Sequence, residues 1–296
     1  MIAPLGQNLL SPYNPRMLFE RITIVGVGLI GGSVGLAARA RNVARSVVGM
    51  GRDPANLTKA QLLGAIDRGT TNLADAVRES DLIVVCTPVD RIAKTILEAA
   101  PHCKPAAIFT DGGSTKASIV NAVGDSLPRG ISFVPAHPIA GSEKNGVEHA
   151  RANLFEKRLT ILTPRPTEMG EAVERVAAFW KALGSRVITM SPDAHDRALA
   201  STSHLPHAIA AAVASVTPVE WLPLSAGGFR DVTRIAGGDP QLWTAIFQAN
   251  RDAVLAALSQ FTLRLDEFRR LMETGDGAGI QHWLAEAKQV RDALGT

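Results

Sequence analysis

A glycine-rich loop over residues 26–31, with the sequence GVGLIG, places the strongest constraint on how this chain folds. It follows a β-branched run at residues 22–25 and precedes a helical stretch, which is the setting of a dinucleotide-binding turn. Gly26 would form the tight turn, Gly28 would let the backbone approach a pyrophosphate, and Gly31 would let helix and strand pack closely. The loop predicts dinucleotide binding at a helix N-terminus, unless it proves to be occluded and merely structural.

Short apolar runs alternate with helical stretches from Arg21 to Thr189, a pattern typical of stacked βαβ units and a mostly parallel sheet. Their nearly continuous apolar character is what strands covered on both faces require. They cover residues 22–25, 47–50, 82–86, 107–110, 133–136, 159–163 and 186–189. This part of the chain is therefore predicted to be an α/β Rossmann-type domain.

Strand-like runs stop after Pro192, and the rest of the chain carries helical patterns. Two of them cover residues 205–216 and 242–258, and glycine and proline breaks separate them. A length of 296 residues also fits two domains. We predict a tail over residues 1–19, a dinucleotide-binding Rossmann domain over residues 20–190, and an all-α helical domain for substrate binding and dimerisation over residues 191–296.

The composition argues against several classes of protein. No apolar run approaches the roughly 18 residues of a membrane span. The net charge of +3 comes from Lys and Arg scattered among acidic residues, so it does not indicate nucleic-acid binding. Cys86 lies in an apolar run and is expected to pack in a core, and Cys103 is the other cysteine. Without a signal-peptide pattern over residues 1–19, we expect a soluble protein of the reducing cytoplasm.

The end of the second predicted strand usually decides between NAD and NADP, because an acid there binds the ribose 2′-hydroxyl and an arginine accommodates the 2′-phosphate. Gly51 stands where the acid is expected and Arg52 follows it, which favours NADP. Asp53 could still reach the ribose, so both cofactors stay open. The residues expected to hold the dinucleotide are Gly26, Gly28, Leu29, Ile30, Gly31, Arg52, Thr87 and Pro88.

Further segments carry polar residues to which a purely structural interpretation gives no role. They are residues 111–116 (DGGSTK), 137–143 (HPIAGSE), 203–207 (SHLPH) and 227–236 (GGFRDVTRIA), with Asp239, Pro240 and Trp243 just after. Together with residues 28–33 they resemble, in order and spacing, the prephenate/arogenate dehydrogenase family of tyrosine biosynthesis. The resemblance covers roughly residues 20–260, and the linked segments make it specific.

The resemblance implies an oxidative decarboxylation of prephenate, in which hydride leaves ring C4 for the nicotinamide, the 4-hydroxyl is deprotonated and CO₂ departs. His137, after the predicted strand at residues 133–136, would take the hydroxyl proton, with Ser114 as a second hydroxyl at that centre. Arg234 of the helical domain would grip a substrate carboxylate. The ring would therefore lie between the domains.

The resemblance also implies further pocket residues. They are His207, Ser142, Glu143, Arg230 and Trp243. Arg230 precedes Arg234 by four residues and would share its helix face, where it contacts the second carboxylate or pairs with a neighbouring acid. Trp243 is a pocket or interface aromatic, although an apolar helix position also explains it. The family often has Thr where Ser142 stands.

His204 and His207 would share a helix face, and with His195 or Asp196 nearby they also fit a metal site. The implied chemistry needs no Lewis acid, and the resemblance makes His204 structural. No metal is therefore predicted.

Two other functions fit part of the pattern. A β-hydroxyacid-type dehydrogenase would need a lysine as acid/base group in the cleft, and only Lys116 and Lys181 come near, in unsuitable settings. A non-catalytic NAD(P) sensor would need the glycine loop but not His137, Ser114 and Arg234 together. Hydride transfer with prephenate separates the enzyme from the sensor.

Small molecules and a second copy are the expected partners, with neither nucleic acid nor membrane among them. Prephenate is the expected substrate, and arogenate stays an alternative because Glu156 is a candidate acceptor for its ammonium group. The chain leaves no room for a regulatory domain of about 70 residues, so tyrosine is expected to inhibit by direct competition. Apolar faces on the C-terminal helices, and the resemblance, imply a homodimer through the helical domain.

Overall fold

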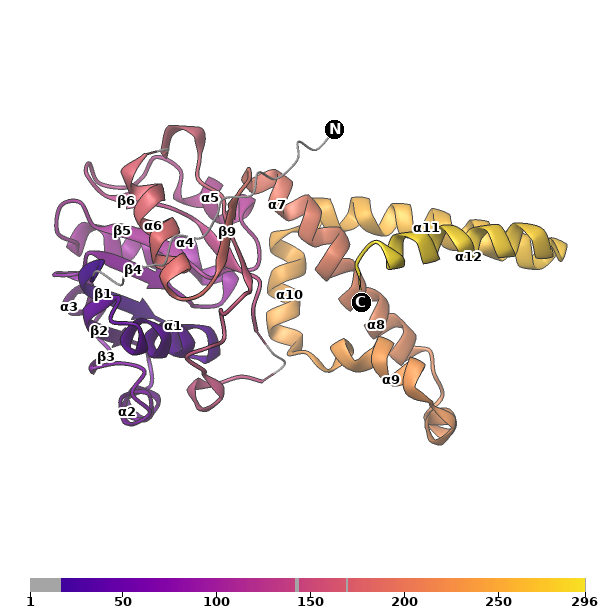
Figure 1. Cartoon of the computed structure of the whole chain (residues 1–296), viewed down its shortest axis with the longest axis horizontal. Helices are drawn as coiled ribbons and strands as arrows, with labels where there is room; N and C mark the ends of the chain where they lie inside the picture. Colours follow the sequence, from indigo (N-terminus) through magenta and orange to yellow (C-terminus); the bar gives the residue numbers. More distant parts are fainter. Residues whose placement is uncertain (1–16, 142–143, 169, 296) are drawn as a thin grey trace.

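The computed structural model describes residues 17–141, 144–168 and 170–295. An α/β part is followed by a helical part, and the two meet between strand β9 (Arg186–Thr189) and helix α7 (Pro192–Leu199), as Figure 1 shows. This order confirms the predicted Rossmann-type domain followed by helices.

A parallel sheet with the strand order β3-β2-β1-β4-β5-β6 forms the centre of the α/β part. Its strands are β1 (Phe19–Val25), β2 (Ala44–Met50), β3 (Arg68–Thr70), β4 (Leu82–Val85), β5 (Ile108–Asp111) and β6 (Ser132–Phe133). Because β1 pairs with β2 on one side and β4 on the other, the strand order reverses at β1. Open α/β sheets bind their ligands at the carboxyl ends of the strands at such a switch point.

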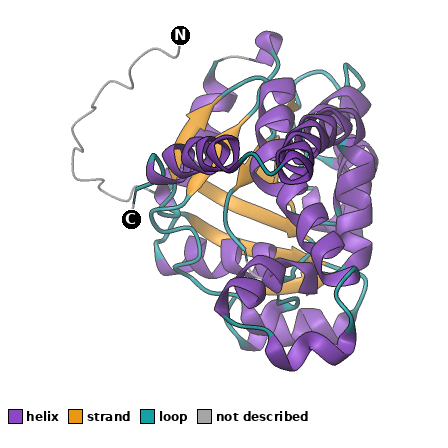
Figure 2. Ribbon diagram, turned by 90° about the vertical axis from the view of Figure 1, so that its right-hand side faces the viewer, coloured by secondary structure: helices purple, strands orange, loops and turns teal. Residues whose placement is uncertain are grey.

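Helices cover both faces of this sheet, as Figure 2 shows, which explains why its strands are apolar almost throughout. One face packs against α1 (Leu29–Ala40), α2 (Pro54–Leu62) and α6 (Glu171–Ala182). The other packs against α3 (Leu73–Val77), α4 (Val89–Ala99) and α5 (Ala117–Val123). Short 3-10 turns lie at η1 (Ala100–His102), η2 (Val147–His149) and η3 (Pro166–Glu168).

A second sheet, in the order β7-β8-β9, completes the α/β part. Strand β7 (Ala136–Pro138) is antiparallel to β8 (Leu159–Leu162), and β9 is parallel to β8. The expected mostly parallel sheet is therefore divided. The short strand β3 was also not predicted, because its sequence, Arg-Gly-Thr, contains no apolar run.

The prediction of one strand over residues 133–136 is wrong. Strand β6 ends at Phe133, and β7 begins only after Pro135. Proline has no N–H to donate to a strand ladder, so the chain leaves one sheet and enters the other at this point. His137 consequently lies inside β7, opposite Ile161, rather than just after a strand.

Helices and turns make up the described chain beyond Thr189. They are α7, the π-helical turn η4 (Ala200–His204), α8 (Leu205–Ser215), η5 (Val219–Leu224), α9 (Gly227–Thr233), η6 (Arg234–Gly237), α10 (Pro240–Ala249), α11 (Arg251–Thr274) and α12 (Gly277–Asp292). Helices α7 and α10 contact the α/β part through α5 and α4, whereas α11 and α12 form a pair that projects away from it (Figure 1). Over the described residues, no helix combines the length and apolar character needed to cross a bilayer.

The expected helix over residues 242–258 is broken at Asn250, whose backbone (φ −117°, ψ 32°) separates α10 from α11. The buried Asn250 amide donates to the backbone oxygen of Asp196 at 2.8 Å and lies 3.0 Å from His204 Nδ1. The break thus serves a tertiary polar contact, which helix propensity cannot predict.

Candidate active site

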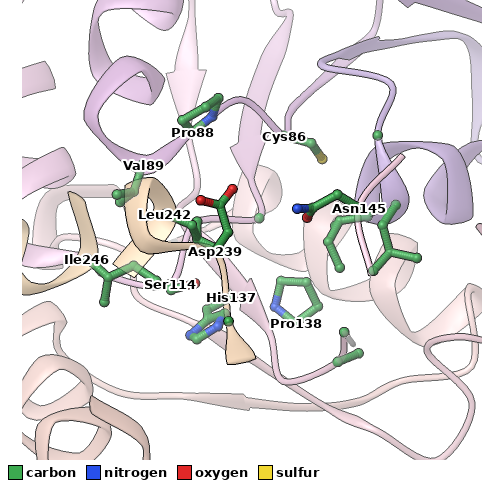
Figure 3. A pocket seen from close by; sticks show the side chains of 18 of the residues that line it. Cys86, Pro88, Val89, Ser114, His137, Pro138, Asn145, Asp239, Leu242 and Ile246 are labelled. Carbon is green, nitrogen blue, oxygen red and sulfur yellow. The ribbon is translucent and has the colours of Figure 1, made fainter. Parts of the chain in front are cut away.

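A cavity of about 1450 Å³ lies between the carboxyl ends of the parallel strands and the helical part. The predicted residues that line it are Gly28, Leu29, Ile30, Arg52, Thr87, Pro88, Ser114, His137, His207, Arg234 and Trp243. Figure 3 shows His137 and Ser114 of the α/β part around the same space as Asp239 of the helical part. The fold therefore gathers residues from almost the whole length of the chain in one place.

The three glycines of the loop do different things. Gly26 has a left-handed φ of +93°, and a Cβ there would come within 2.7 Å of the Cys86 carbonyl oxygen. A Cβ on Gly31 would come within 2.2 Å of the Gly26 carbonyl oxygen. Gly28 has no described protein atom within 4 Å of its Cβ position and lines the cavity. Gly26 and Gly31 thus shape the loop, and Gly28 leaves room for a ligand.

Within the described part of the chain, two polar features of the residues that line the cavity lack a side-chain partner. Helix α1 begins after Gly28, and no side chain of the described residues caps its first N–H groups. The hydroxyl Oγ1 of Thr87 is buried and has no hydrogen-bond partner among the described residues. A dinucleotide would supply acceptors for both, because helix N-termini favour phosphate. The residues present therefore fit this cofactor.

The side chains of Arg52 and Asp53, which follow the end of β2, have different surroundings. Arg52 is exposed and lines the cavity. Asp53 caps α2, where its Oδ1 accepts a hydrogen bond from the Ala55 N–H at 2.9 Å. The carboxylate next to the predicted ribose site is thus already engaged, whereas the guanidinium is exposed at the cavity.

The backbone before His137 is held by a buried ion pair between Asp111 and Lys116, both fully buried. The Ala136 N–H donates to Asp111 Oδ1 at 2.9 Å, and Lys116 Nζ donates to the Ala136 carbonyl oxygen at 2.9 Å. Burial lowers the pKa of Lys116, and Asp111 opposes this shift. The ammonium of Lys116 is therefore engaged with the strand and lies outside the cavity lining.

His137 connects to the helical part through a chain of buried side chains. Its Nδ1 lies 2.8 Å from Nε2 of His195, and Nδ1 of His195 lies 2.7 Å from Oδ1 of Asp196. The Asp196 carboxylate also accepts the backbone N–H of Lys116 at 2.8 Å and that of Ala117 at 2.9 Å. One carboxylate on α7 thus binds the start of α5 and supports the two histidines.

Burial sets the protonation of His137, His204 and His207. It lowers the pKa of His137 well below 6.5, and the positive charge of the nearby Lys116 adds to the effect. It lowers the pKa of His204 to about 4, although Asp196 opposes the shift. His207 also has a lowered pKa, mainly through burial. At neutral pH the His137 ring is therefore uncharged and carries one nitrogen lone pair.

The helical side of the cavity carries an aromatic stack and an arginine. The rings of His207 and Trp243 are stacked, with centroids 3.4 Å apart and an interplanar angle of 26°. His207 Nδ1 lies 3.0 Å from the Ser203 carbonyl oxygen, which leaves Nε2 for other contacts. Arg234, at the start of η6, is exposed and lines the same cavity.

The remaining predicted pocket residues are Arg230, Ser142 and Glu143. Arg230 is exposed and is not among the residues that line the cavity. Helix α9 ends at Thr233 and a 3-10 turn begins at Arg234, so the helix face that the two arginines would share does not continue. Ser142 and Glu143 lie outside the described residues.

His195 and Asp196 were considered in the sequence only as possible metal ligands, and the contact of His195 with His137, and of Asp196 with His195, was missed. The available signal was that His195 precedes the buried Leu199 by four residues, which places a histidine on the buried face of α7. Within the described ranges, no group of three or more His, Cys, Asp or Glu side chains is arranged to hold a metal ion. These side chains instead bond to one another and to backbone.

Comparison with known proteins gives matches along most of the chain. Residues 34–189 match the family profile described as the nucleotide-binding domain of prephenate dehydrogenase, and residues 191–286 match its dimerization domain. The cyclohexadienyl dehydrogenase of Zymomonas mobilis is 36% identical over 94% of this chain and 97% of its own length. The prephenate dehydrogenase of Bacillus subtilis is 33% identical over 93% of this chain and 76% of its own length.

A solved structure shares the whole architecture. The prephenate dehydrogenase of Aquifex aeolicus, in complex with hydroxyphenyl propionate and NAD⁺, superposes with a TM-score of 0.86 at 33% identity, covering 93% of this chain and 98% of that one. With both domain profiles matched in order and the fold shared over 93% of the chain, the chain belongs to the prephenate dehydrogenase family of oxidoreductases.

Proposed function

We propose that this protein is a prephenate dehydrogenase, which converts prephenate to 4-hydroxyphenylpyruvate and CO₂ with hydride transfer to NAD(P)⁺ in tyrosine biosynthesis. One observation carries the proposal: the uncharged His137, the cationic Arg234 and Gly28 of the glycine loop all line one cavity. The reaction needs a base, a carboxylate-binding cation and a dinucleotide site in contact with the same substrate. Family membership supports the same chemistry.

A nicotinamide dinucleotide bound in this cavity supplies the hydride acceptor. Gly28 and the first N–H groups of α1 would hold its pyrophosphate, and Thr87 Oγ1 would gain the partner that it lacks among the described residues. Leu29, Ile30 and Pro88 line the surrounding wall.

His137 handles a proton that the overall reaction neither gains nor loses. Prephenate loses hydride from C4 and CO₂ from C1, and the product keeps a hydroxyl at C4. We assign to His137 the transient step: its ring nitrogen takes the hydroxyl proton as hydride leaves, giving a dienone. It returns that proton to the phenolate oxygen once CO₂ has left. Ser114, at the same cavity wall, would orient the hydroxyl.

Arg234 would bind a substrate carboxylate, because a guanidinium presents paired donors that match a carboxylate. His207, held by its stack on Trp243, lies beside it in the cavity wall and offers its second ring nitrogen to the substrate. Since these residues come from the helical part and His137 from the α/β part, the substrate would bridge the two.

The test is a two-by-two assay of prephenate and arogenate with NAD⁺ and NADP⁺, in which the absorbance of the reduced nicotinamide is followed. We expect hydride transfer with prephenate, and its loss in a His137→Gln variant. An unsubstituted protein that binds dinucleotide but transfers no hydride from either substrate would contradict the proposal and favour a sensor.

Arogenate is the second candidate substrate, favoured by the similarity to a relative named for the cyclohexadienyl ring. Glu156, the candidate acceptor for its ammonium group, forms an ion pair with Arg41 at 2.6 Å. Because this carboxylate already has a partner, prephenate remains the preferred substrate.

For the cofactor we propose a preference for NADP⁺, which rests on Arg52 at the cavity and on Asp53 being engaged as a helix cap. Replacing Arg52 by Ala removes a cation that can bind the 2′-phosphate. We expect the KM for NADP⁺ to rise about 10- to 100-fold, with much less change for NAD⁺. Arg45→Ala, at an exposed arginine outside the cavity lining, is the matched control. An equal rise for both cofactors would remove the preference.

We propose a cytoplasmic homodimer joined through the helical part. Its support is the profile match to a dimerization domain and the exposure of large apolar side chains there, such as Trp221 and Leu263. The cysteines Cys86 and Cys103 are both free thiols, as in a reducing compartment.

Tyrosine shares a phenol ring and a carboxylate with the reaction product, so we expect it to bind at Arg234 and compete with the substrate. Steady-state rates at several tyrosine concentrations should show a rising apparent KM for prephenate at constant kcat. A falling kcat at constant KM would place the inhibitor elsewhere.

A further inference from the structure

The Asp196 carboxylate is surrounded by hydrogen-bond donors. Its Oδ1 accepts the Lys116 backbone N–H at 2.8 Å and its Oδ2 accepts the Ala117 N–H at 2.9 Å. A backbone N–H can only donate, so both oxygens act as acceptors. His195 Nδ1, 2.7 Å from Oδ1, must therefore be a donor as well. This assigns a proton to Nδ1 of His195.

The direction of the hydrogen bond between His195 and His137 follows from that of the first bond. His195 is fully buried, and with its one ring proton on Nδ1 the uncharged ring has its lone pair on Nε2, which is then an acceptor. That nitrogen lies 2.8 Å from Nδ1 of His137, which must then be the donor of this bond. His137 is neutral and has given its one ring proton to this contact, so its Nε2 carries the lone pair. Nε2 is then the nitrogen available to take a proton.

We infer that Asp196 and His195 are positioning residues, which fix His137 in the tautomer that has its proton on Nδ1 and its lone pair on Nε2. This inference rests on the proposed function for its kinetic consequences, because a base must present its lone pair to the substrate hydroxyl. Neither His195 nor Asp196 lines the large cavity, so both act through His137.

The same carboxylate also ties the two parts of the protein together. Asp196 lies on α7 of the helical part, and its backbone donors lie at the start of α5 in the α/β part. Asp111 and Lys116 in turn hold Ala136 by its N–H and its carbonyl oxygen. These two bonds fix the strand just before His137. The ring of His195 packs edge-on against the ring of His137, with the two ring centroids 5.1 Å apart.

The first test is spectroscopic and needs no substrate. In the full-length protein labelled with ¹⁵N at histidine, the imidazole nitrogen shifts report which nitrogen of each ring carries the proton, and a His137→Gln variant identifies the His137 signals. We expect the proton of His137 on Nδ1, and a neutral His195 with its proton also on Nδ1. A proton on Nε2 of His137, or a doubly protonated His195, would overturn the inference.

The second test separates an acceptor role from a packing role. His195→Phe fills the space without a hydrogen-bond acceptor, whereas His195→Gln offers an amide oxygen to His137 Nδ1. For the Phe variant we expect kcat to fall about 100-fold or more, the lower part of the range for a positioned base. KM for prephenate and for the cofactor should stay within about threefold of that of the unsubstituted protein, and the Gln variant should keep kcat within about tenfold.

A control and the contrary outcomes complete the design. His102→Gln, at an exposed histidine of η1, should leave kcat unchanged. Equal losses in the Phe and Gln variants, or no loss in the Phe variant, would reject the acceptor role. A protein that oxidises prephenate but carries its His137 proton on Nε2 refutes the inference alone. One with the expected tautomer but no hydride transfer refutes only the proposed function. The spectrum of the unsubstituted protein decides the inference even where a variant fails to fold.

Discussion

Asp111 and Lys116 are charged side chains with no exposed surface, an uncommon situation in proteins. A buried ion pair adds little net stability, because desolvation of the two charges offsets their attraction. Removing one partner leaves an unpaired buried charge and costs about 3–5 kcal/mol. The pair is therefore better understood through what it holds, which is the backbone of Ala136, one residue before His137.

The pH dependence of the reaction follows from the state of His137. Because burial holds the pKa of His137 well below 6.5, the ring is already neutral throughout the neutral range. A base works in its neutral form, so we expect kcat/KM to be flat from about pH 8 to about pH 6.5 and to fall only at lower pH. Initial rates at low substrate concentration measure this profile. An acidic limb centred near pH 6.5 or above would show that His137 is not the titrating base.

At the scale of elements, the turn from β1 into α1 combines a folding constraint with a binding site. Gly31 is needed because any Cβ would strike the Gly26 carbonyl oxygen, whereas Gly28 faces space open to a ligand. Strand β7 shows a comparable division of roles, since Pro135 moves the chain between sheets and the strand that follows carries His137. Backbone geometry at two short segments thus sets where the proposed cofactor site and the proposed base lie.

The two glycines give a matched pair of variants. Gly31→Ala should destabilise the fold by about 1–3 kcal/mol, as overpacked sites do, because its Cβ would lie 2.2 Å from a backbone oxygen. Gly28→Ala should leave the free energy of unfolding nearly unchanged but weaken dinucleotide binding about tenfold or more, since the methyl group would occupy the ligand's approach. Denaturant unfolding and cofactor titration measure the two effects. Similar effects of both variants on stability would contradict this division.

At the scale of the whole molecule, the two parts differ in how they bury apolar surface. Helices cover both faces of the parallel sheet in the α/β part, whereas the helical part carries a projecting pair of helices. Helices α11 and α12 extend away from the cavity (Figure 1), and α11 alone exposes Leu255, Leu263, Leu265 and Met272. Exposed apolar side chains gathered in one region are typical of an interface with another chain. The arrangement leaves the cavity on the side of the helical part that contacts the α/β part.

The proposed dimer predicts that the protein has twice the mass of one chain by light scattering at micromolar concentration. Leu263 is 60% exposed on α11, and Leu263→Asp should shift the mass toward that of one chain, because a charge cannot be buried unpaired in an interface. Leu62→Asp, at a leucine 84% exposed on α2, should leave the mass unchanged. A monomeric unsubstituted protein would reject the dimer.

Much of the fold and of the candidate site could be predicted from local sequence. The GVGLIG loop, the apolar runs and the helical patterns predicted the two-part fold, and the polar segments pointed to Ser114, His137, Arg234 and some of the other residues that line the cavity. These features depend on turn geometry and hydrophobic periodicity, which act between residues close in the chain. The expected elements differed from the observed ones at Pro135, whose missing N–H ends the strand pairing, and at Asn250, where a tertiary polar contact breaks the helix.

The support behind His137 was decided only by the tertiary structure. His195 and Asp196 are 58 and 80 residues from His137 and Lys116, the residues they contact, and no local pattern links such distant groups. Arg230 shows the converse, because its four-residue spacing from Arg234 was clear but the helix ended between them. Local sequence thus determined most of the elements that form, whereas packing of α7 against α5 placed His195 and Asp196 behind His137. The physical reason is that buried polar groups must find partners, and those partners are set by the packing of elements that are distant in sequence.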